Sequence, residues 1–292
     1  MKPSYAALVV TGWLALTPLT LGFAKAPDAT TYPLTLTRGS RLMVDAEVNG
    51  RAVRALLDSA AEVTLIDRGF AHDLKLETGE TVTGQGSGKA SFDAVLIKGV
   101  QLRVFGVSLA NQSVAVVDLG DVGRRLLGHR LDVILGREIF DAVRLRIDIE
   151  GRQVTVLPTD SRPLGVYLPL TTEHGVETIS VRVENIGPVQ ATFDLGNGSE
   201  VLVGEALARR LQVLSDGRTI TTGRGGGLGG ETVRQRFALH SLEVAGQRFN
   251  DVPAAIDAHA SASDLNLGVA ILRHFLITTD FAGHAVWLEP RR

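Results

Sequence analysis

The sequence contains no cysteine, which excludes disulfide bridges, thiolate metal sites and a lipid-anchored cysteine. Aromatic residues are scarce, at 5%, whereas glycine is abundant, with 32 residues. This balance favours many short strands joined by tight turns over helices packed by large side chains. The net charge is only −2, so neither a nucleic acid nor an anionic membrane is indicated as a partner. A chain of 292 residues can still bury enough apolar surface to fold without cross-links, as one large domain or two ordinary ones.

The motifs of several common chemistries are missing as well. The seven histidines show no paired spacing typical of metal ligands, so we expect no metal and no other cofactor. No Gly-x-Ser-x-Gly turn is present to support a serine hydrolase. The glycine-rich run at 222–230 lacks the Gly-Lys-Ser/Thr of a phosphate-binding loop. Any catalysis must therefore come from other side chains.

The first 26 residues have the composition of an export signal. Lys2 supplies a positive start, the stretch from Ala6 to Ala24 carries no charge, and residues 24–26 form a small-x-small cleavage site. The uncharged stretch is nearly long enough to cross a bilayer, so an uncleaved membrane anchor is the alternative. We expect residues 1–26 to be a signal peptide, and the protein to be periplasmic or secreted, with no stable membrane insertion after cleavage.

The rest of the chain repeats one pattern. Residues 53–58 and 189–194 are apolar strands that each end in a lone acid, Asp58 and Asp194. A repeat whose period is near half the chain indicates two duplicated lobes and not a solenoid of short units. Two lobes that each carry one acid at the end of a strand can build one shared site containing both.

The remaining motifs follow in the same order in both copies. An apolar-Leu-Gly step ends at Gly136 in the first copy and at Gly268 in the second, at nearly the same distance from the acid. We place the lobes at residues 34–158 and 164–290, with a polar link at 159–163 between them. We expect mostly strands, a hairpin turn at Asn49-Gly50, and brief helices at 68–76, 137–142, 205–211 and 268–275.

The acids lie in the runs Leu57-Asp58-Ser59-Ala60-Ala61 and Phe193-Asp194-Leu195-Gly196-Asn197. Together with the later apolar-Leu-Gly steps, these runs resemble the retropepsin-like aspartic proteases, in particular bacterial exported members with two fused lobes. The resemblance covers roughly residues 40–290. It implies an all-β fold of two pseudo-symmetric barrel lobes with short helices and an active cleft between the lobes.

The resemblance also implies a chemistry for the acids. Two carboxyl groups within hydrogen-bond reach share one proton, so one can activate a water molecule while the other polarises a peptide carbonyl. Asp58 and Asp194 would be this catalytic dyad of an aspartic endopeptidase, with Ser59 supporting Asp58 and Gly196 permitting close backbone approach. The substrate would be an extended polypeptide. Because both lobes belong to one chain, we expect a monomer.

Two glycine-rich loops are candidates for flaps that close over the substrate, because glycine permits the backbone conformations of a hinge. Ordinary disordered surface turns are the alternative. The candidate flap residues are Gly84, Gly86 and Gly88 in the first lobe and Gly225, Gly226 and Gly227 in the second.

Two residues depart from the family pattern. Ala60 stands where the family has glycine, and Leu195 stands where it has threonine or serine. These departures motivate a second hypothesis, a catalytically silent protein that binds peptides on the same fold. A third hypothesis is an anchored envelope module whose lobes serve assembly.

Overall fold

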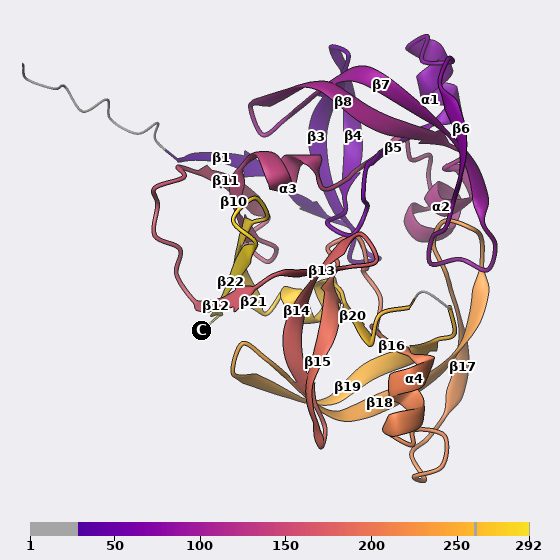
Figure 1. Cartoon of the computed structure of the whole chain (residues 1–292), viewed down its shortest axis with the longest axis vertical. Helices are drawn as coiled ribbons and strands as arrows, with labels where there is room; N and C mark the ends of the chain where they lie inside the picture. The colour runs from indigo at the N-terminus through magenta and orange to yellow at the C-terminus, as the bar shows by residue number, and fades with distance from the viewer. Residues whose placement is uncertain (1–28, 260–261, 292) are drawn as a thin grey trace, which may run out of the picture.

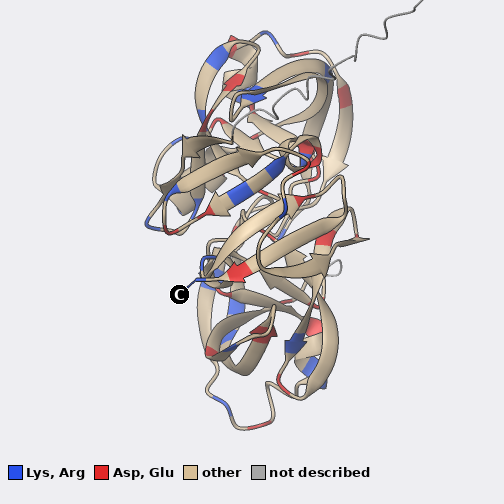
Figure 2. Ribbon diagram, turned by 90° about the vertical axis from the view of Figure 1, so that its left-hand side faces the viewer, with Lys and Arg blue, Asp and Glu red and all other residues tan. Residues whose placement is uncertain are grey.

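The computed structural model describes residues 29–259 and 262–291, so the predicted signal peptide lies outside the described residues. Figure 1 shows two lobes of β structure, one above the other, joined on one side by a third sheet. This arrangement confirms the predicted all-β, two-lobed fold. Within the described ranges, no helix is long and apolar enough to cross a membrane. In Figure 2, basic and acidic residues are interspersed along both lobes.

The first lobe is an eight-stranded sheet in the order β2-β3-β4-β9-β5-β8-β7-β6, which an additional pairing of β3 with β7 closes on itself. Four short helical segments accompany it. The strands are β2 (Thr35–Leu36), β3 (Leu42–Val48), β4 (Arg51–Leu57), β5 (Thr64–Asp67), β6 (Glu80–Gly84), β7 (Phe92–Val104), β8 (Val107–Val117) and β9 (Val133–Leu135). The helical segments are α1 (Arg68–Asp73), α2 (Gly120–Val122), the π-helix η1 (Gly123–Leu127) and α3 (Glu138–Ala142).

The second lobe repeats this arrangement as β13-β14-β15-β20-β16-β19-β18-β17, with β14 also paired to β18. Its strands are β13 (Thr171–Glu173), β14 (Val176–Val183), β15 (Ile186–Phe193), β16 (Val201–Gly204), β17 (Thr221–Gly225), β18 (Thr232–Val244), β19 (Gln247–Asp257) and β20 (Leu265–Leu267). Its helices are α4 (Glu205–Arg210) and α5 (Val269–Leu272).

Six further strands form one sheet to which both halves of the chain contribute, in the order β1-β11-β10-β21-β22-β12. The closing hairpin of the first half pairs with that of the second, since Leu145, Arg146 and Ile147 lie opposite Thr279, Thr278 and Ile277. An ion pair of 2.5 Å between Arg144 and Asp280 crosses the same junction. These strands are β1 (Thr30–Pro33), β10 (Arg144–Asp148), β11 (Gln153–Leu157), β12 (Val166–Pro169), β21 (Phe275–Asp280) and β22 (Ala285–Pro290).

Local sequence explains the hairpin that leads to the first acid. Asn49 and Gly50 adopt φ of 48° and 81°, the left-handed pair of a two-residue turn that asparagine and glycine tolerate best. The turn brings β3 and β4 into register, with Val48 opposite Arg51 and Met43 opposite Leu56. The strand β4 then runs from an exposed start to a fully buried end, which places Asp58 at the inner end of the lobe.

The short helices begin close to the positions that the sequence predicts, but most are shorter. The predicted helix at 68–76 ends at Asp73, and the one at 268–275 covers only Val269–Leu272. In the first case Lys75 has φ of 58°, which a helix cannot accommodate. The sequence does not predict a helix at residues 120–127, where α2 and η1 lie.

Aromatic rings pack where the lobes meet. The ring of Phe281 lies 5.1 Å from that of Phe140 on α3 and 6.3 Å from that of Phe193 on β15. All three side chains are buried. The junction is therefore held by a continuous apolar core as well as by the shared sheet.

Removing the ring of Phe281 should loosen this junction. For Phe281→Ala we expect the free energy of unfolding to fall by about 3–5 kcal/mol, because the change leaves a cavity among groups from both lobes. Urea denaturation measures the change. Val233→Ala is the control, since Val233 is 71% exposed and should cost less than about 0.5 kcal/mol. A loss for Phe281→Ala no larger than that of the control would contradict the role given to this ring.

Candidate active site

The two acids lie at equivalent points of the two lobes. Each follows the last residue of a strand that pairs in parallel with the apolar-Leu-Gly strand, since β4 pairs with β9 and β15 with β20. The backbone N–H of Asp58 donates to the carbonyl of Leu135, and that of Asp194 to the carbonyl of Leu267, each over 3.0 Å. The same backbone bond therefore fixes the start of both acid-bearing loops.

The end of each acid-bearing loop is fixed in the same way. Arg137 N–H donates to Ala61 O over 2.9 Å, and Val269 N–H donates to Asn197 O over 2.7 Å. Gly268 must be glycine here, since a Cβ atom at that position would lie 2.2 Å from Asn197 O. The glycine of the repeated apolar-Leu-Gly step thus allows the backbone to contact the loop that carries the acid.

Ser59 connects the two loops. Its hydroxyl donates to the carbonyl of Phe193 over 2.8 Å and accepts from the N–H of Leu195 over 2.9 Å. The side chain is only 2% exposed, so both partners would be buried and unpaired without it. The hydroxyl thereby fixes the first acid-bearing loop against the second.

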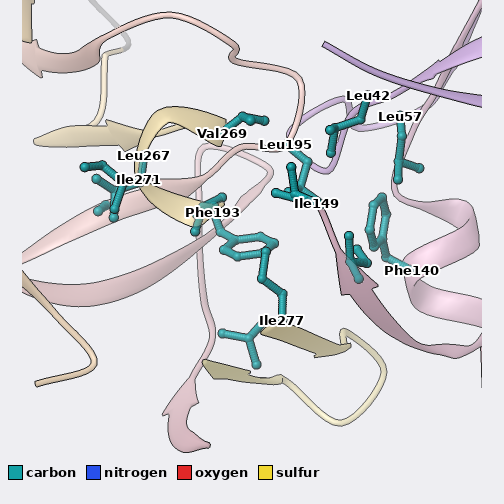
Figure 3. Close-up of a cluster of buried hydrophobic side chains, with 14 of the residues drawn as sticks. Leu42, Leu57, Phe140, Ile149, Phe193, Leu195, Leu267, Val269, Ile271 and Ile277 are labelled. Atoms are coloured by element: carbon teal, nitrogen blue, oxygen red, sulfur yellow. The ribbon is translucent and has the colours of Figure 1, made fainter. Parts of the chain in front are cut away.

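Leu195 makes no matching bond in the opposite direction, because it has no hydroxyl. Its side chain is fully buried and belongs to the main core. Figure 3 shows it among apolar side chains of both lobes, including Leu42 and Leu57 of the first and Phe193 of the second. At this position the second lobe contributes apolar packing, and the hydrogen bonds between the loops come from Ser59.

The first acid lies close to the backbone of the second acid-bearing loop at Gly196. A Cβ atom on this residue would lie 2.2 Å from the Cγ and 2.3 Å from the Oδ2 of Asp58. The carboxyl group of Asp58 therefore rests on the backbone of the loop that carries Asp194. A side chain at position 196 would push the two loops apart.

The two carboxyl groups accept different sets of hydrogen bonds. Asp58 Oδ1 accepts from Ala60 N–H over 2.9 Å. Asp194 Oδ1 accepts from the N–H groups of Gly196 and Asn197, over 2.8 and 2.9 Å, and its Oδ2 accepts from Asn266 Nδ2 over 2.7 Å. Asp194 thus has three donors from its own lobe.

Both acids hold their protons more tightly than an acid in water. Desolvation by the surrounding protein, together with the negative charge of Asp194, raises the pKa of Asp58 to about 8. Desolvation also raises the pKa of Asp194, against the opposing effect of its hydrogen bonds from Asn266, Asn197 and Gly196. Each residue retains some exposed surface, yet the protein around them disfavours two negative charges at once. The pair therefore has the electrostatics of two acids that share a proton.

Arg41 is a further charged group at this site. It is 8% exposed, and its Nη1 donates to Gly39 O over 3.0 Å. A Cβ atom on Gly198 would lie 1.9 Å from Nη1, so the guanidinium group of the first lobe lies against the backbone of the second acid-bearing loop. Burial lowers the pKa of Arg41, and the charges of Asp194 and Asp58 oppose this effect. Its positive charge in turn favours ionisation of both acids.

The two glycine-rich loops meet on one side of the molecule, where the hairpins β6–β7 and β17–β18 approach each other in Figure 1. Gly88 N–H donates to Leu228 O over 2.7 Å, and Ala90 N–H donates to Gly229 O over 2.9 Å. A Cβ atom on Gly88 would lie 2.3 Å from the carbonyl carbon of Gly229. The loops are therefore bonded to each other through their backbones and are not separate surface turns.

Each loop is also held by a side chain from the other lobe. Arg125 on η1 donates to the carbonyls of Gly226 and Gly227, over 3.0 and 2.8 Å. His259 Nε2 lies 2.6 Å from the carbonyl of Gly88. Gly84 and Gly225 are the last residues of β6 and β17, and Gly86 lies against Leu228. All six predicted flap glycines thus lie in or next to one contact between the lobes.

Sequence reasoning missed three polar residues here, Arg41, Arg125 and Asn266. Only Asn266 carries a signal in the sequence, because it stands between Leu265 and Leu267, and an amide in an apolar strand needs a hydrogen-bond partner when buried. Arg41 and Arg125 stand among other arginines in polar runs, where a solvated side chain is the ordinary expectation. Across the described ranges, no group of three histidine, aspartate or glutamate side chains could hold a metal ion.

Comparison with known proteins agrees with this geometry. The family model described as aspartyl protease matches the chain twice, over residues 44–139 and 179–271. These two matches contain Asp58 and Asp194, and together they cover more than half of the sequence. No curated protein matches the chain. The chain belongs to the aspartyl protease family, as a two-lobed, retropepsin-like member.

Proposed function

We propose that the protein is an aspartic endopeptidase in which Asp58 and Asp194 form the catalytic dyad. The observation that carries the proposal is the contact of the Asp58 carboxyl group with Gly196, on the loop of the opposite acid. It is supported by the Ser59 bridge between the same two loops and by the raised pKa of both acids. Polypeptides are the substrate class that membership of the family implies.

The dyad would catalyse hydrolysis without a covalent intermediate. The ionised acid takes a proton from a bound water as the water oxygen attacks the peptide carbonyl carbon, and the protonated acid gives its proton to the carbonyl oxygen. Collapse of the resulting diol breaks the C–N bond. The leaving nitrogen receives a proton from the acid that took one from water, and a diol hydroxyl returns a proton to the other acid. The pair thus ends with the single proton it began with.

The loops 84–90 and 222–230 would act as flaps. An extended peptide binds such a cleft by strand-like hydrogen bonds to the backbone, and the flaps open to admit it. In this structure the two loops are bonded to each other and to Arg125 and His259, so substrate entry requires these contacts to break. We further propose that the protein acts as a monomer after export, because one chain supplies both acids.

The silent peptide-binding protein remains a second candidate, and two observations motivate it. Leu195 leaves the bridge between the loops with one hydroxyl in place of two. Ala60 brings a methyl group to the position equivalent to Gly196. Such a protein would bind extended peptides between its lobes and leave them intact.

Replacing either acid of the dyad by asparagine separates these candidates. We expect Asp58→Asn and Asp194→Asn each to lower kcat on an unstructured protein substrate by at least about a thousandfold, because each removes the proton transfer of one partner. The assay runs from pH 3 to 9. We expect cleavage by the unaltered protein to decline above about pH 8, where the pair loses its shared proton. Peptide binding without cleavage supports the silent protein, and cleavage that survives both substitutions excludes the dyad.

The raised pKa of Asp58 also predicts how stability depends on pH. The folded protein retains a proton up to about pH 8 that the unfolded chain releases near pH 4, so the stability of the fold falls as pH rises through this interval. Asp58→Asn removes this titration. We expect the variant to be more stable than the unaltered protein at pH 8, on the order of a few kcal/mol, and to lose that advantage below about pH 4.

Urea denaturation at pH 8 and below about pH 4 measures the stability of Asp58→Asn and of the unaltered protein. The control is Asp251→Asn, at an exposed position on β19, which should show no such difference between the two pH values. Equal stability of Asp58→Asn and the unaltered protein at pH 8 would contradict the assigned pKa.

Arg125 offers a test of the flap contact. Arg125→Gln removes two charge-assisted hydrogen bonds to the carbonyls of Gly226 and Gly227. We expect amide hydrogens of residues 222–230 to exchange at least about tenfold faster, since local opening costs less free energy. Hydrogen exchange followed by mass spectrometry measures the change. Arg124→Gln is the matched control, because the neighbouring Arg124 is exposed. Unchanged exchange in Arg125→Gln would contradict the role given to Arg125 in holding this loop.

A further inference from the structure

The two lobes differ at the residue that precedes the Leu-Gly pair, in the middle of β9 and of β20. In the first lobe it is Ile134, which packs into a second apolar cluster with Leu56 and Leu131. In the second lobe it is Asn266, whose Nδ2 donates to Asp194 Oδ2 over 2.7 Å. The acid of the second lobe therefore has a side-chain donor, and across the described residues no side chain donates to Asp58.

The orientation of the Asn266 amide is fixed by a chain of hydrogen bonds that begins at the backbone of Ser199. The backbone N–H of Ser199 can only donate, and it donates to Asn197 Oδ1 over 2.9 Å. The remaining end of that amide, Asn197 Nδ2, donates to Asn266 Oδ1 over 2.8 Å. The Nδ2 of Asn266 is then the end that faces Asp194. A chain of three residues thus presents an N–H group, and not an oxygen, to the acid.

An ionised carboxylate can accept hydrogen bonds from N–H groups at both of its oxygens, whereas a protonated carboxyl group carries a hydrogen on one of them. Asp194 accepts at both oxygens, from three N–H groups in total. Asp58 accepts only from backbone N–H groups of its own loop, from Ala60 at Oδ1 and from Ala61. The nearby charges act in the same sense, since the charge of Asp194 raises the pKa of Asp58 and Arg41 interacts more strongly with Asp194 than with Asp58.

We propose that the relay Ser199–Asn197–Asn266 breaks the symmetry of the dyad by keeping Asp194 ionised and leaving the shared proton on Asp58. Asp194 is then the base that takes the proton from water, and Asp58 is the acid that protonates the carbonyl oxygen. Asn266 acts through Asp194 and is a positioning residue. This assignment of roles rests on the proposed function, but the location of the proton does not.

The test compares Asn266→Ile, which introduces the residue of the first lobe, with the unaltered protein. Carbon-13 NMR of labelled aspartate, assigned with Asp58→Asn and Asp194→Asn, follows the titration of each carboxyl group without any need for activity. In the unaltered protein we expect Asp194 to titrate at lower pH than Asp58. In Asn266→Ile we expect the titration of Asp194 to move up by about one pH unit, because a hydrogen bond to the charged form is lost.

Two further variants make the outcome specific. Asn266→Gln keeps an amide donor and should restore part of the shift, and it replaces Asn266→Ile if that variant fails to fold. Ile134→Val, at the matched position of the first lobe, should leave both titrations unchanged. If the protein cleaves peptides, the acidic limb of kcat/KM should move with Asp194 in Asn266→Ile.

The outcomes separate the two proposals. Titrations as expected without any cleavage support the relay and count against the endopeptidase. Titration of Asp58 below Asp194, or an unmoved Asp194 in folded Asn266→Ile, overturns the relay and leaves the endopeptidase untouched.

Discussion

Two loops that each carry an acid must approach to backbone contact, and this constraint explains the residues around them. Glycine at 196 is required because any Cβ atom would meet the Asp58 carboxyl group. Ser59 is required because the approach buries a carbonyl and an N–H group that would cost about 1–3 kcal/mol each if left unpaired. Leu195 makes no hydrogen bond of this kind to the first loop, and its burial contributes about 1.5–3 kcal/mol of apolar packing instead. The departure from the family pattern at Leu195 is thus compatible with closely joined loops.

The close approach of the two acid-bearing loops also lowers the stability of the fold. Desolvation and the neighbouring charge of Asp194 make Asp58 keep a proton that the unfolded chain would release. The free energy of unfolding therefore falls as pH rises toward 8. The rest of the molecule must offset this cost. The six-stranded sheet and the packing of Phe140, Phe193 and Phe281 bind the lobes together on one side of the molecule. Contacts far from the acids therefore keep the acids close to one another.

The sequence predicts the family and the fold, and both predictions are confirmed. Local signals suffice for these, as in the Asn49-Gly50 turn and the strands that end in Asp58 and Asp194. The shared sheet could not be predicted, because the alternation of residues in β10 shows that it has a partner but not that the partner is β21 in the other lobe. The contact between the glycine-rich loops could not be predicted either, because Gly88 and Leu228 are joined through backbone groups, which leave no signal in the sequence. The catalytic roles of the acids and the bounds of the lobes stay predictions.

A single chain can differentiate its two lobes in a way that a symmetric dimer cannot. In a dimer, leucine at the position of Leu195 would occur twice and remove the bridge between the loops altogether, whereas here Ser59 keeps it. Alanine at the position of Ala60 would likewise occur twice, and the glycine that accommodates the opposite carboxyl group would be lost. The substitution at Asn266 follows the same logic, because an amide donor beside both acids would favour ionisation of both and oppose the sharing of a proton. Each departure from symmetry is tolerable because the other lobe retains the residue that holds the two loops together. Fusing two lobes therefore allows the two acids to have different surroundings, as Asp58 and Asp194 do here.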